Sequence, residues 1–383
     1  MSKFKIQQIF LNGWNQYSEK FFPSEVQNKA ALSIMHCKSG TLGRNASMCT
    51  ECGHVEFHNN SCRNRNCPNC QAILKEIWID ARRAEVFDMP YFHAVFTLPA
   101  QLNPLIYANQ KLLYSLMHRC SAQTLLDLSR DKKYLGATPS IVQVLHTWGQ
   151  KLNYHPHIHC IVSGGGLTAD MKLKESSAKF FIPVKVMGSL FRGKFLAELR
   201  KYYSTGSLAF SSSCQHLNNP AEWDRFIDSL YRIDWCPYIK ETFNGFGNAI
   251  DYLGRYTHRI AITNTRIKSV TETHVTFTAR DYRTGNVDDV TISCCEFIRR
   301  FMQHVLPSGF QKIRYFGLLS NRSKKRNLRI VFSLQGHQKF KSLFVNASVS
   351  DVMRSVWDYD IRICSECGCF TMKQIGRSFN QRE

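Results

Sequence analysis

Six of the chain's 15 cysteines lie between residues 37 and 70, in a polar, asparagine-rich stretch that offers no core to bury them. Thiols in such a setting are typical of a metal site. Two C-x-x-C pairs, Cys49 with Cys52 and Cys67 with Cys70, are separated by 14 residues, which is close to zinc-ribbon spacing. The spacing therefore predicts one tetrahedral Zn²⁺ site formed by Cys49, Cys52, Cys67 and Cys70.

Other side chains in the same region leave alternatives open. Each of four neighbours could replace one of the predicted ligands: Cys37, Cys62, His54 and His58. Arg63 and Arg65 suit phosphate contacts, or they belong to a solvated basic loop. A second metal site is a further candidate near the other end of the chain, with Cys364, Cys367 and Cys369 as ligands and Cys294 and Cys295 as completing ligands.

The net charge of this chain of 383 residues indicates which class of molecule it binds. Fifty Lys and Arg against 29 Asp and Glu give a formal net charge of +21, spread along the whole length, which favours nucleic acid as the partner. The 44% hydrophobic content is ample for globular domains. No signal peptide is recognisable and no apolar run approaches the ~18 residues of a membrane span, so we expect a cytoplasmic protein without a membrane partner.

Hydrophobic periodicity predicts an α+β fold. Residues 72–87, 104–130 and 184–202 have helical spacing, whereas residues 91–99, 141–150 and 157–165 have the aromatic and β-branched content of strands. This order predicts a central antiparallel sheet flanked by helices, preceded by a small Cys-rich zinc module and followed by a mixed β/α region. The expected domains are 1–90 (zinc-binding and DNA-binding, with a connecting helix), 91–270 (catalytic) and 271–383 (basic C-terminal region).

The stretch HPHIHCIVSGGG places histidines at alternate positions of a predicted strand. Because side chains at i and i+2 share one face of a strand, His157 and His159 could hold a divalent ion together. If the preceding strand folds back through the turn KLNYHP, Gln150 lies across from His157 and provides a third ligand. The alternative is that these are ordinary satisfied or surface histidines.

A second motif, NAIDYLGRYTHRIAI, spans residues 248–262. On a helix, Tyr252 and Tyr256 emerge from one face, and Gly254 between them permits close approach of a bulky partner. A tyrosine phenol titrates near ~10, so it becomes a nucleophile only beside a metal-polarised phosphate or cations such as Arg255 and Arg259. The alternative is that the two tyrosines pack as ordinary core.

These motifs, together with SCRNRNCPNCQ and residues 297–322, occur in an order that resembles the rolling-circle transposases of bacterial insertion sequences. That family is the two-tyrosine branch of the HUH endonuclease superfamily, and the resemblance runs from about Cys37 to about Cys369. It implies that His157 and His159 bind the metal, that Tyr252 and Tyr256 are the nucleophiles, and that the N-terminal cysteines form a zinc-binding module. Related nucleases carry a third polar ligand before the histidine pair, which again favours Gln150.

The resemblance implies nicking of single-stranded DNA at transposon ends with Mg²⁺ or Mn²⁺, a 5′-phosphotyrosine intermediate, and transfer of one strand to target DNA near the bacterial nucleoid. Besides Arg63, Arg65, Arg255 and Arg259, we expect DNA contacts from a basic loop at 320–330 that contains Lys324, Lys325 and Arg326. A plasmid replication initiator or relaxase would use the same chemistry. A non-catalytic zinc-containing DNA-binding regulator would have no use for the paired tyrosines.

Overall fold

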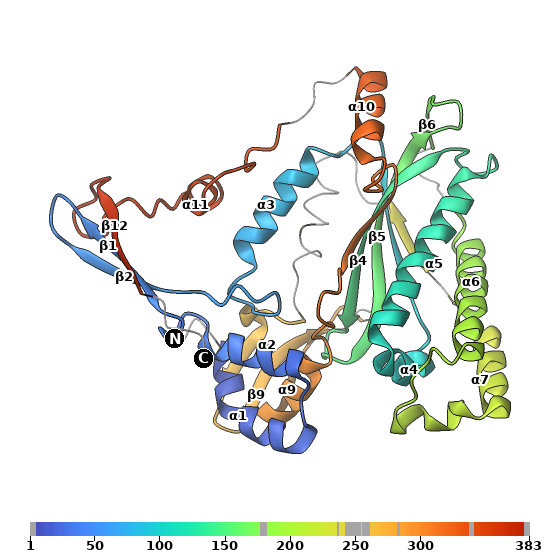
Figure 1. Cartoon of the computed structure of the whole chain (residues 1–383), viewed down its shortest axis with the longest axis horizontal. Helices are drawn as coiled ribbons and strands as arrows, with labels where there is room; N and C mark the ends of the chain where they lie inside the picture. Colours follow the sequence, from blue (N-terminus) through green and yellow to red (C-terminus); the bar gives the residue numbers. More distant parts are fainter. Residues whose placement is uncertain are drawn as a thin grey trace.

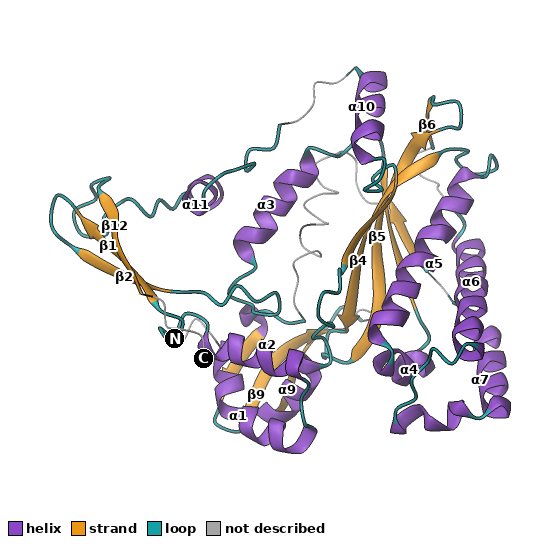
Figure 2. Cartoon of the chain, viewed as in Figure 1, coloured by secondary structure: helices purple, strands orange, loops and turns teal. Residues whose placement is uncertain are grey.

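The structure is a computed structural model that describes residues 5–176, 182–235, 237–241, 254, 261–281, 284–336 and 341–378. Helices surround three antiparallel sheets, which confirms the predicted α+β class (Figures 1 and 2). Among the described residues, no helix is both long enough and apolar enough to cross a membrane.

The largest sheet has six strands in the order β11-β4-β5-β3-β7, with β6 paired to β5. The three predicted strands of the catalytic region are confirmed as its centre. Their bounds and those of the remaining strands are β3 (Tyr91–Thr97), β4 (Thr138–Trp148), β5 (Tyr154–Leu167), β6 (Leu173–Glu175), β7 (Tyr238–Glu241) and β11 (Ile313–Gly317). Because β11 belongs to this sheet, the boundary predicted at residue 270 does not separate the later chain from it.

One face of the central sheet is covered by helices of the middle region, which include those predicted at 104–130 and 184–202 (Figure 2). Phe96, Ile158 and Leu145 are fully or almost fully buried on this face, against Phe191 and other apolar side chains of the helices. The helices are α4 (Asn103–Ala108), α5 (Gln110–Arg130), α6 (Val184–Ser204) and α7 (Pro220–Arg232), with short 3-10 turns at Ala100–Leu102 and Ser212–Asn218.

The opposite face carries the alternate residues of the same strands. Val144 and Ile161 pack there with Ile79 of helix α3 (Ala72–Arg83) and Val331 of helix α10 (Lys324–Gln335). The predicted helix at 72–87 is therefore confirmed in its main part. The predicted loop at 320–330 is wrong, because helix α10 begins at Lys324 and buries Leu328 and Val331 on this face.

A second core joins the beginning of the chain to residues far along it. Helices α1 (Lys5–Phe21) and α2 (Glu25–His36) pack on α9 (Cys294–Met302) and on the sheet β10-β9-β8, which follows the 3-10 turn Asn264–Arg266. The approach of α1 to α9 needs glycine, since a Cβ on Gly13 would lie 2.8 Å from the Cβ of Cys294. The strands are β8 (Ile267–Val270), β9 (His274–Arg280) and β10 (Val287–Ser293).

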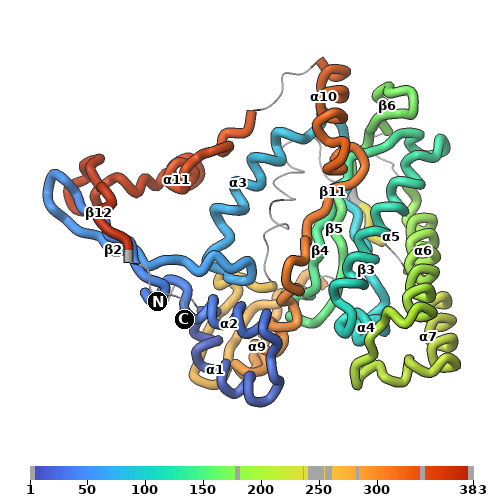
Figure 3. The backbone as a smooth tube through the Cα atoms, viewed as in Figure 1, coloured from blue at the N-terminus to red at the C-terminus, as the bar shows by residue number. Residues whose placement is uncertain are grey.

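The third sheet, β12-β1-β2, lies apart from the central sheet, as the tube in Figure 3 shows. Helix α11 (Val349–Trp357) precedes its strand β12 along the chain. Its strands are β1 (Arg44–Cys49), β2 (Val55–Asn59) and β12 (Met372–Ser378). Strand β1 lies between the other two and pairs with both, so the beginning and the end of the described chain share one small sheet.

Candidate metal centres

Three histidines meet on neighbouring strands of the central sheet. The antiparallel pairing of β4 with β5 sets His146 directly opposite His157, and His159 follows two residues later on the same face. One ring nitrogen from each of the three lies within 4.8 Å of the others. This face also carries Val144 and Ile161, so the histidines lie on the side of the sheet that α3 covers.

The predicted position of Gln150 opposite His157 is wrong. Strand β4 ends at Trp148, which pairs with Tyr154, and Gln150 lies in the turn that follows. Its backbone carbonyl accepts a hydrogen bond of 2.6 Å from Arg266. The hairpin turn lies earlier in the chain than the sequence suggested, at residues 149–153 instead of 151–156, which moves the register and brings His146 to the position expected for Gln150. The missed signal was His146 itself, the one histidine in this buried strand.

Hydrogen bonds fix the orientation of two of the rings. The Nδ1 of His157 lies 2.7 Å from the carbonyl oxygen of His155, to which it donates when protonated. The Nδ1 of His159 lies 2.9 Å from the Nε2 of His93 on β3, and these two rings stack with centroids 5.1 Å apart. When both Nδ1 atoms carry the proton, each Nε2 is the ring nitrogen with the lone pair that metal ligation requires.

Burial favours the neutral form of His157 and of its neighbour His93. Loss of hydration lowers the pKa of His157 from its usual value to about 4 and lowers that of His93 likewise to about 4. His146 stacks on Trp148 with ring centroids 4.4 Å apart. In the described part of the chain the cluster consists of imidazoles alone, so it adds no negative charge to attract a cation. The cluster is therefore suited to an ion whose coordination shell is completed by a phosphate oxygen.

The tyrosine motif falls largely outside the described residues, which include neither Tyr252 and Tyr256 nor Arg255 and Arg259. Gly254, between the two tyrosines, is described as helical and buried. A Cβ at Gly254 would lie 2.2 Å from the Cδ1 of Ile79 on α3, so the predicted close approach at this glycine is confirmed. Ile79 belongs to the helix that covers the histidine face of the sheet.

The cysteines form two groups of four, and each contains one of the predicted C-x-x-C pairs. The first group, Cys37, Cys62, Cys67 and Cys70, lies where α2 ends and the chain turns toward α3. The Sγ of Cys70 is 3.4 Å from that of Cys37 and 3.6 Å from that of Cys62. Cys37 and Cys62, considered only as alternatives from the sequence, thus stand where Cys49 and Cys52 were expected.

The second group brings Cys49 and Cys52 together with Cys364 and Cys367. The single site predicted from Cys49, Cys52, Cys67 and Cys70 is therefore wrong. Spacing could not reveal this, because all four partners of a site need not be close in sequence. Cys294 and Cys295 are buried in the α1/α9 core and complete neither group, and the Sγ of Cys369 lies 3.8 Å from the carbonyl oxygen of Cys367.

The predicted DNA contacts have different surroundings. Arg65 donates hydrogen bonds of 2.7 to 3.0 Å to the carbonyl oxygens of Leu306, Pro307 and Phe310, so its guanidinium joins the zinc-domain loop to the chain after α9. Lys324 forms an ion pair with Glu85. The remaining three described candidates, Arg63, Lys325 and Arg326, are exposed.

Comparison with known proteins finds transposases in each case. Residues 140–327 match a family model described as "Putative transposase", and residues 9–98 match one described as "Transposase zinc-binding domain". The chain is 42% identical over 307 residues to the protein named "Putative transposase y4qJ" of Sinorhizobium fredii, covering 80% of this chain and 77% of that one. It is 29% identical over 316 residues to the transposase of the insertion sequence element IS801 of Pseudomonas savastanoi pv. phaseolicola, covering 81% and 74%. No solved structure matches.

Proposed function

The chain belongs to the family of insertion-sequence transposases that includes the transposase of IS801 and carries a transposase zinc-binding domain, and on this premise we propose that it cuts single-stranded DNA by tyrosine attack assisted by a divalent metal. The observation that carries the proposal is the position of the histidine cluster. His146, His157 and His159 lie on the sheet face covered by α3, and Gly254 of the tyrosine motif packs on that same helix.

The residues present fit an exchangeable divalent ion. Three imidazoles, whose ring nitrogens lie within 4.8 Å of one another and two of which are oriented through Nδ1, provide a preformed face without a carboxylate. We assign Mg²⁺ or Mn²⁺ to His146, His157 and His159, with His146 in place of Gln150. When bound with a DNA phosphate, such an ion would stabilise negative charge on the phosphoryl oxygens.

The covalent step is an in-line displacement at phosphorus. The phenol oxygen of Tyr252 or Tyr256 forms a bond to phosphorus, and the bond from phosphorus to the 3′ oxygen breaks. The phenol gives up its proton, and the released 3′ oxygen gains one to become a 3′-OH. The products are a 5′-phosphotyrosine and a free 3′ end. The reverse displacement, by a 3′-OH of target DNA, transfers the strand without ATP, and two tyrosines allow a second cut while the first strand stays attached.

We assign DNA binding to basic side chains in the zinc-binding domain and in the region that matches the transposase model. The proposed contacts are Arg63, Lys325 and Arg326, together with Arg255 and Arg259 beside the tyrosines. The net charge of +21 supports a polyanionic partner. Zinc held by Cys37, Cys62, Cys67 and Cys70 would fix the loop whose Arg65 contacts the chain after α9. We place the protein in the cytoplasm, at the nucleoid where its DNA lies.

The test is a trapping assay with a 3′-labelled single strand from an element end, resolved on a denaturing gel. The label stays on the fragment that carries the 5′-phosphotyrosine, so wild type should give a labelled protein adduct in Mn²⁺. Tyr252→Phe with Tyr256→Phe should give none, whereas Tyr238→Phe, a substitution of an exposed tyrosine outside the motif, should leave the adduct intact.

An adduct that persists in the double variant would place the nucleophile elsewhere. Binding of the labelled strand without any cleavage by wild type, in the presence of Mn²⁺, would favour a non-catalytic DNA-binding regulator. Cleavage only at a plasmid origin sequence, and not at an element end, would favour a replication initiator or relaxase.

A further inference from the structure

Two short segments at opposite ends of the chain are near copies of each other. Residues 49–53 read CTECG and residues 364–368 read CSECG. Only Cys49 and Cys52 lie inside the matched zinc-binding domain at residues 9–98, whereas Cys364 and Cys367 lie outside both matched regions. Neither family model therefore covers the second pair.

The two segments also have the same backbone conformation. In each, the N–H of the glycine donates to the carbonyl of the first cysteine at 3.0 Å, and the glycine has a φ of +72°. In each, the N–H of the first cysteine donates to the carbonyl five residues later, at 2.8 Å for Cys49 and 2.9 Å for Cys364. A left-handed glycine that closes such a turn leaves both thiols on its inner side.

The thiols of the two turns face each other at metal-ligand distances. The Sγ of Cys49 is 3.6 Å from that of Cys367, and the Sγ of Cys52 is 3.6 Å from that of Cys364. All four sulfurs lie within 4.8 Å of one another. Four thiolates around Zn²⁺ at about 2.3 Å would be about 3.8 Å apart, so little movement is needed to accept the ion.

We propose that Cys49, Cys52, Cys364 and Cys367 bind a second structural Zn²⁺, which closes a zinc ribbon whose two halves come from opposite ends of the chain. Four thiolates favour Zn²⁺ over Mg²⁺ or Mn²⁺, because these harder ions prefer oxygen ligands. The site is thus chemically distinct from the histidine cluster, and its occupancy does not depend on the proposed nicking reaction.

Strand pairing holds the two halves in register. Strand β12 pairs with β1 from Cys49 opposite Met372 to Arg44 opposite Ser378. The hydroxyl of Thr371 lies 3.0 Å from the Sγ of Cys49, and Ser365 donates to a carboxylate oxygen of Glu56 on β2 at 2.6 Å. Each half therefore contacts the other through backbone and side chains around the sulfurs.

Packing alone cannot hold this ribbon together. The buried apolar cluster at its centre consists of Cys49, Cys364 and Met372, and two of these are proposed ligands. Phe57 on β2 and Ile375 on β12 remain 65% and 55% exposed. A unit with so small a core needs a metal or disulfide, and these thiols are free. The ion would supply the folding free energy that packing does not.

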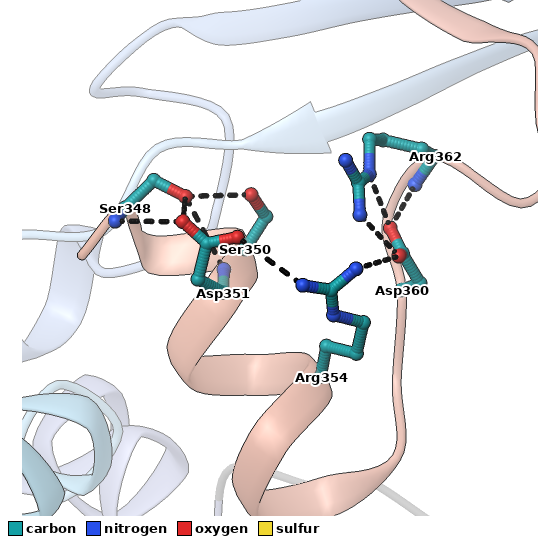
Figure 4. Close-up of polar contacts among 6 residues, drawn as sticks. All are labelled: Ser348, Ser350, Asp351, Arg354, Asp360 and Arg362. Atoms are coloured by element: carbon teal, nitrogen blue, oxygen red, sulfur yellow. Dashed lines mark hydrogen bonds and ion pairs between the residues drawn. The ribbon is translucent and has the colours of Figure 1, made fainter. Parts of the chain in front are cut away.

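A polar network fixes the segment that enters the second turn (Figure 4). The carboxylate of Asp360 accepts hydrogen bonds of 2.9 and 2.7 Å from Arg362 and lies 4.0 Å from Arg354 of α11. The carbonyl of Arg362 in turn accepts from the N–H of Met372 on β12. Helix α11 contacts α3, so the zinc would connect the end of the chain to the helix that covers the histidine face.

The test is a zinc count on the full-length chain after dialysis against EDTA, with bound zinc released by a thiol-modifying mercurial and measured with a chromogenic chelator. Wild type should release two zinc ions per chain. Cys364→Ser with Cys367→Ser should release one. The matched control, Cys369→Ser, removes a neighbouring thiol outside the group and should still release two.

One zinc per chain in wild type, or two in the Cys364→Ser, Cys367→Ser variant, would overturn the proposal. Should that variant be insoluble, cadmium-113 NMR of the Cd²⁺-substituted wild type decides without a substitution. Two tetrathiolate resonances support the second site, and a single one contradicts it. Either result is obtained without DNA, so a failure here is distinguishable from a failure of the nicking proposal.

Discussion

The histidine cluster and the split ribbon are both built on β-strands, but they differ in what holds them. The histidines lie on a six-stranded sheet whose two faces are filled by large apolar clusters. The ribbon has three buried side chains, two of which are cysteines of the proposed site. The sheet therefore positions His146, His157 and His159 with or without an ion, whereas the cysteines depend on one. In the function we propose, metal is a reagent in the first region and part of the fold in the second.

The largest expected effect concerns a cysteine of the first group. Cys67→Ser removes a buried thiol from the group with Cys37, and loss of that zinc should cost about 10 kcal/mol of folding free energy locally. We expect loss of protease resistance in the region before β3 and weaker DNA binding, measured by limited proteolysis and by a filter-binding titration. A variant with wild-type resistance and a full zinc content would show that this first cysteine group holds no zinc on which the fold depends.

Substitution of the histidines should impair nicking but not folding, which is the opposite of the effect expected for Cys67→Ser. His157→Ala with His159→Ala should lower the nicking rate about 100-fold or more, because several kcal/mol of charge stabilisation are lost. Folding and DNA binding should change little. His155→Ala is the matched control, since it keeps the backbone carbonyl that orients His157. Nicking that survives the double substitution would remove the metal from this site.

A smaller effect is expected at His93, which touches a ligand and not the ion. His93→Phe keeps the stacked ring but removes the Nε2 that lies 2.9 Å from His159. We expect Mn²⁺ activation of nicking to require 10 to 100 times more metal, on the order found for such outer partners, with a near-normal rate at saturating Mn²⁺. A lower rate at saturation with an unchanged metal requirement would mean that His93 serves only packing.

The smallest effect tests the contact that connects the tyrosine motif to the sheet. Gly254→Ala would place a Cβ within 2.2 Å of the Cδ1 of Ile79 and should destabilise the fold by about 1 to 3 kcal/mol. Ile79→Ala removes the clashing atoms, so the double variant should be less destabilised than the sum of the two single variants, measured by chemical unfolding. Strict additivity would show that the two residues do not touch.

Elements with a clear hydrophobic period were predictable from the sequence. The helices at 72–87, 104–130 and 184–202 and the three strands around the histidines are present, because burial of one face dictates their spacing. What failed depended on contacts between distant segments. Cys37 and Cys364 each complete a group with cysteines that spacing alone assigned otherwise.

The third histidine was missed for a more local reason. His146 lies opposite His157 in only one hairpin register, and a shift in that register would place another residue opposite His157. The sequence shows the histidine but not the length of the turn. Similarly, the basic run at 320–330 resembles a loop in composition, yet Leu328 and Val331 give helix α10 an apolar side that packs on the sheet.

We propose that a removable ion in the histidine cluster drives DNA cleavage, whereas zinc only maintains the fold. The most direct measurement follows nicking of a labelled single strand by full-length protein dialysed against EDTA, before and after addition of Mn²⁺, with bound zinc counted in the same samples. We expect nicking to disappear and then return with Mn²⁺, at an unchanged zinc content. Full nicking in EDTA, or recovery only when zinc is added, would contradict the account.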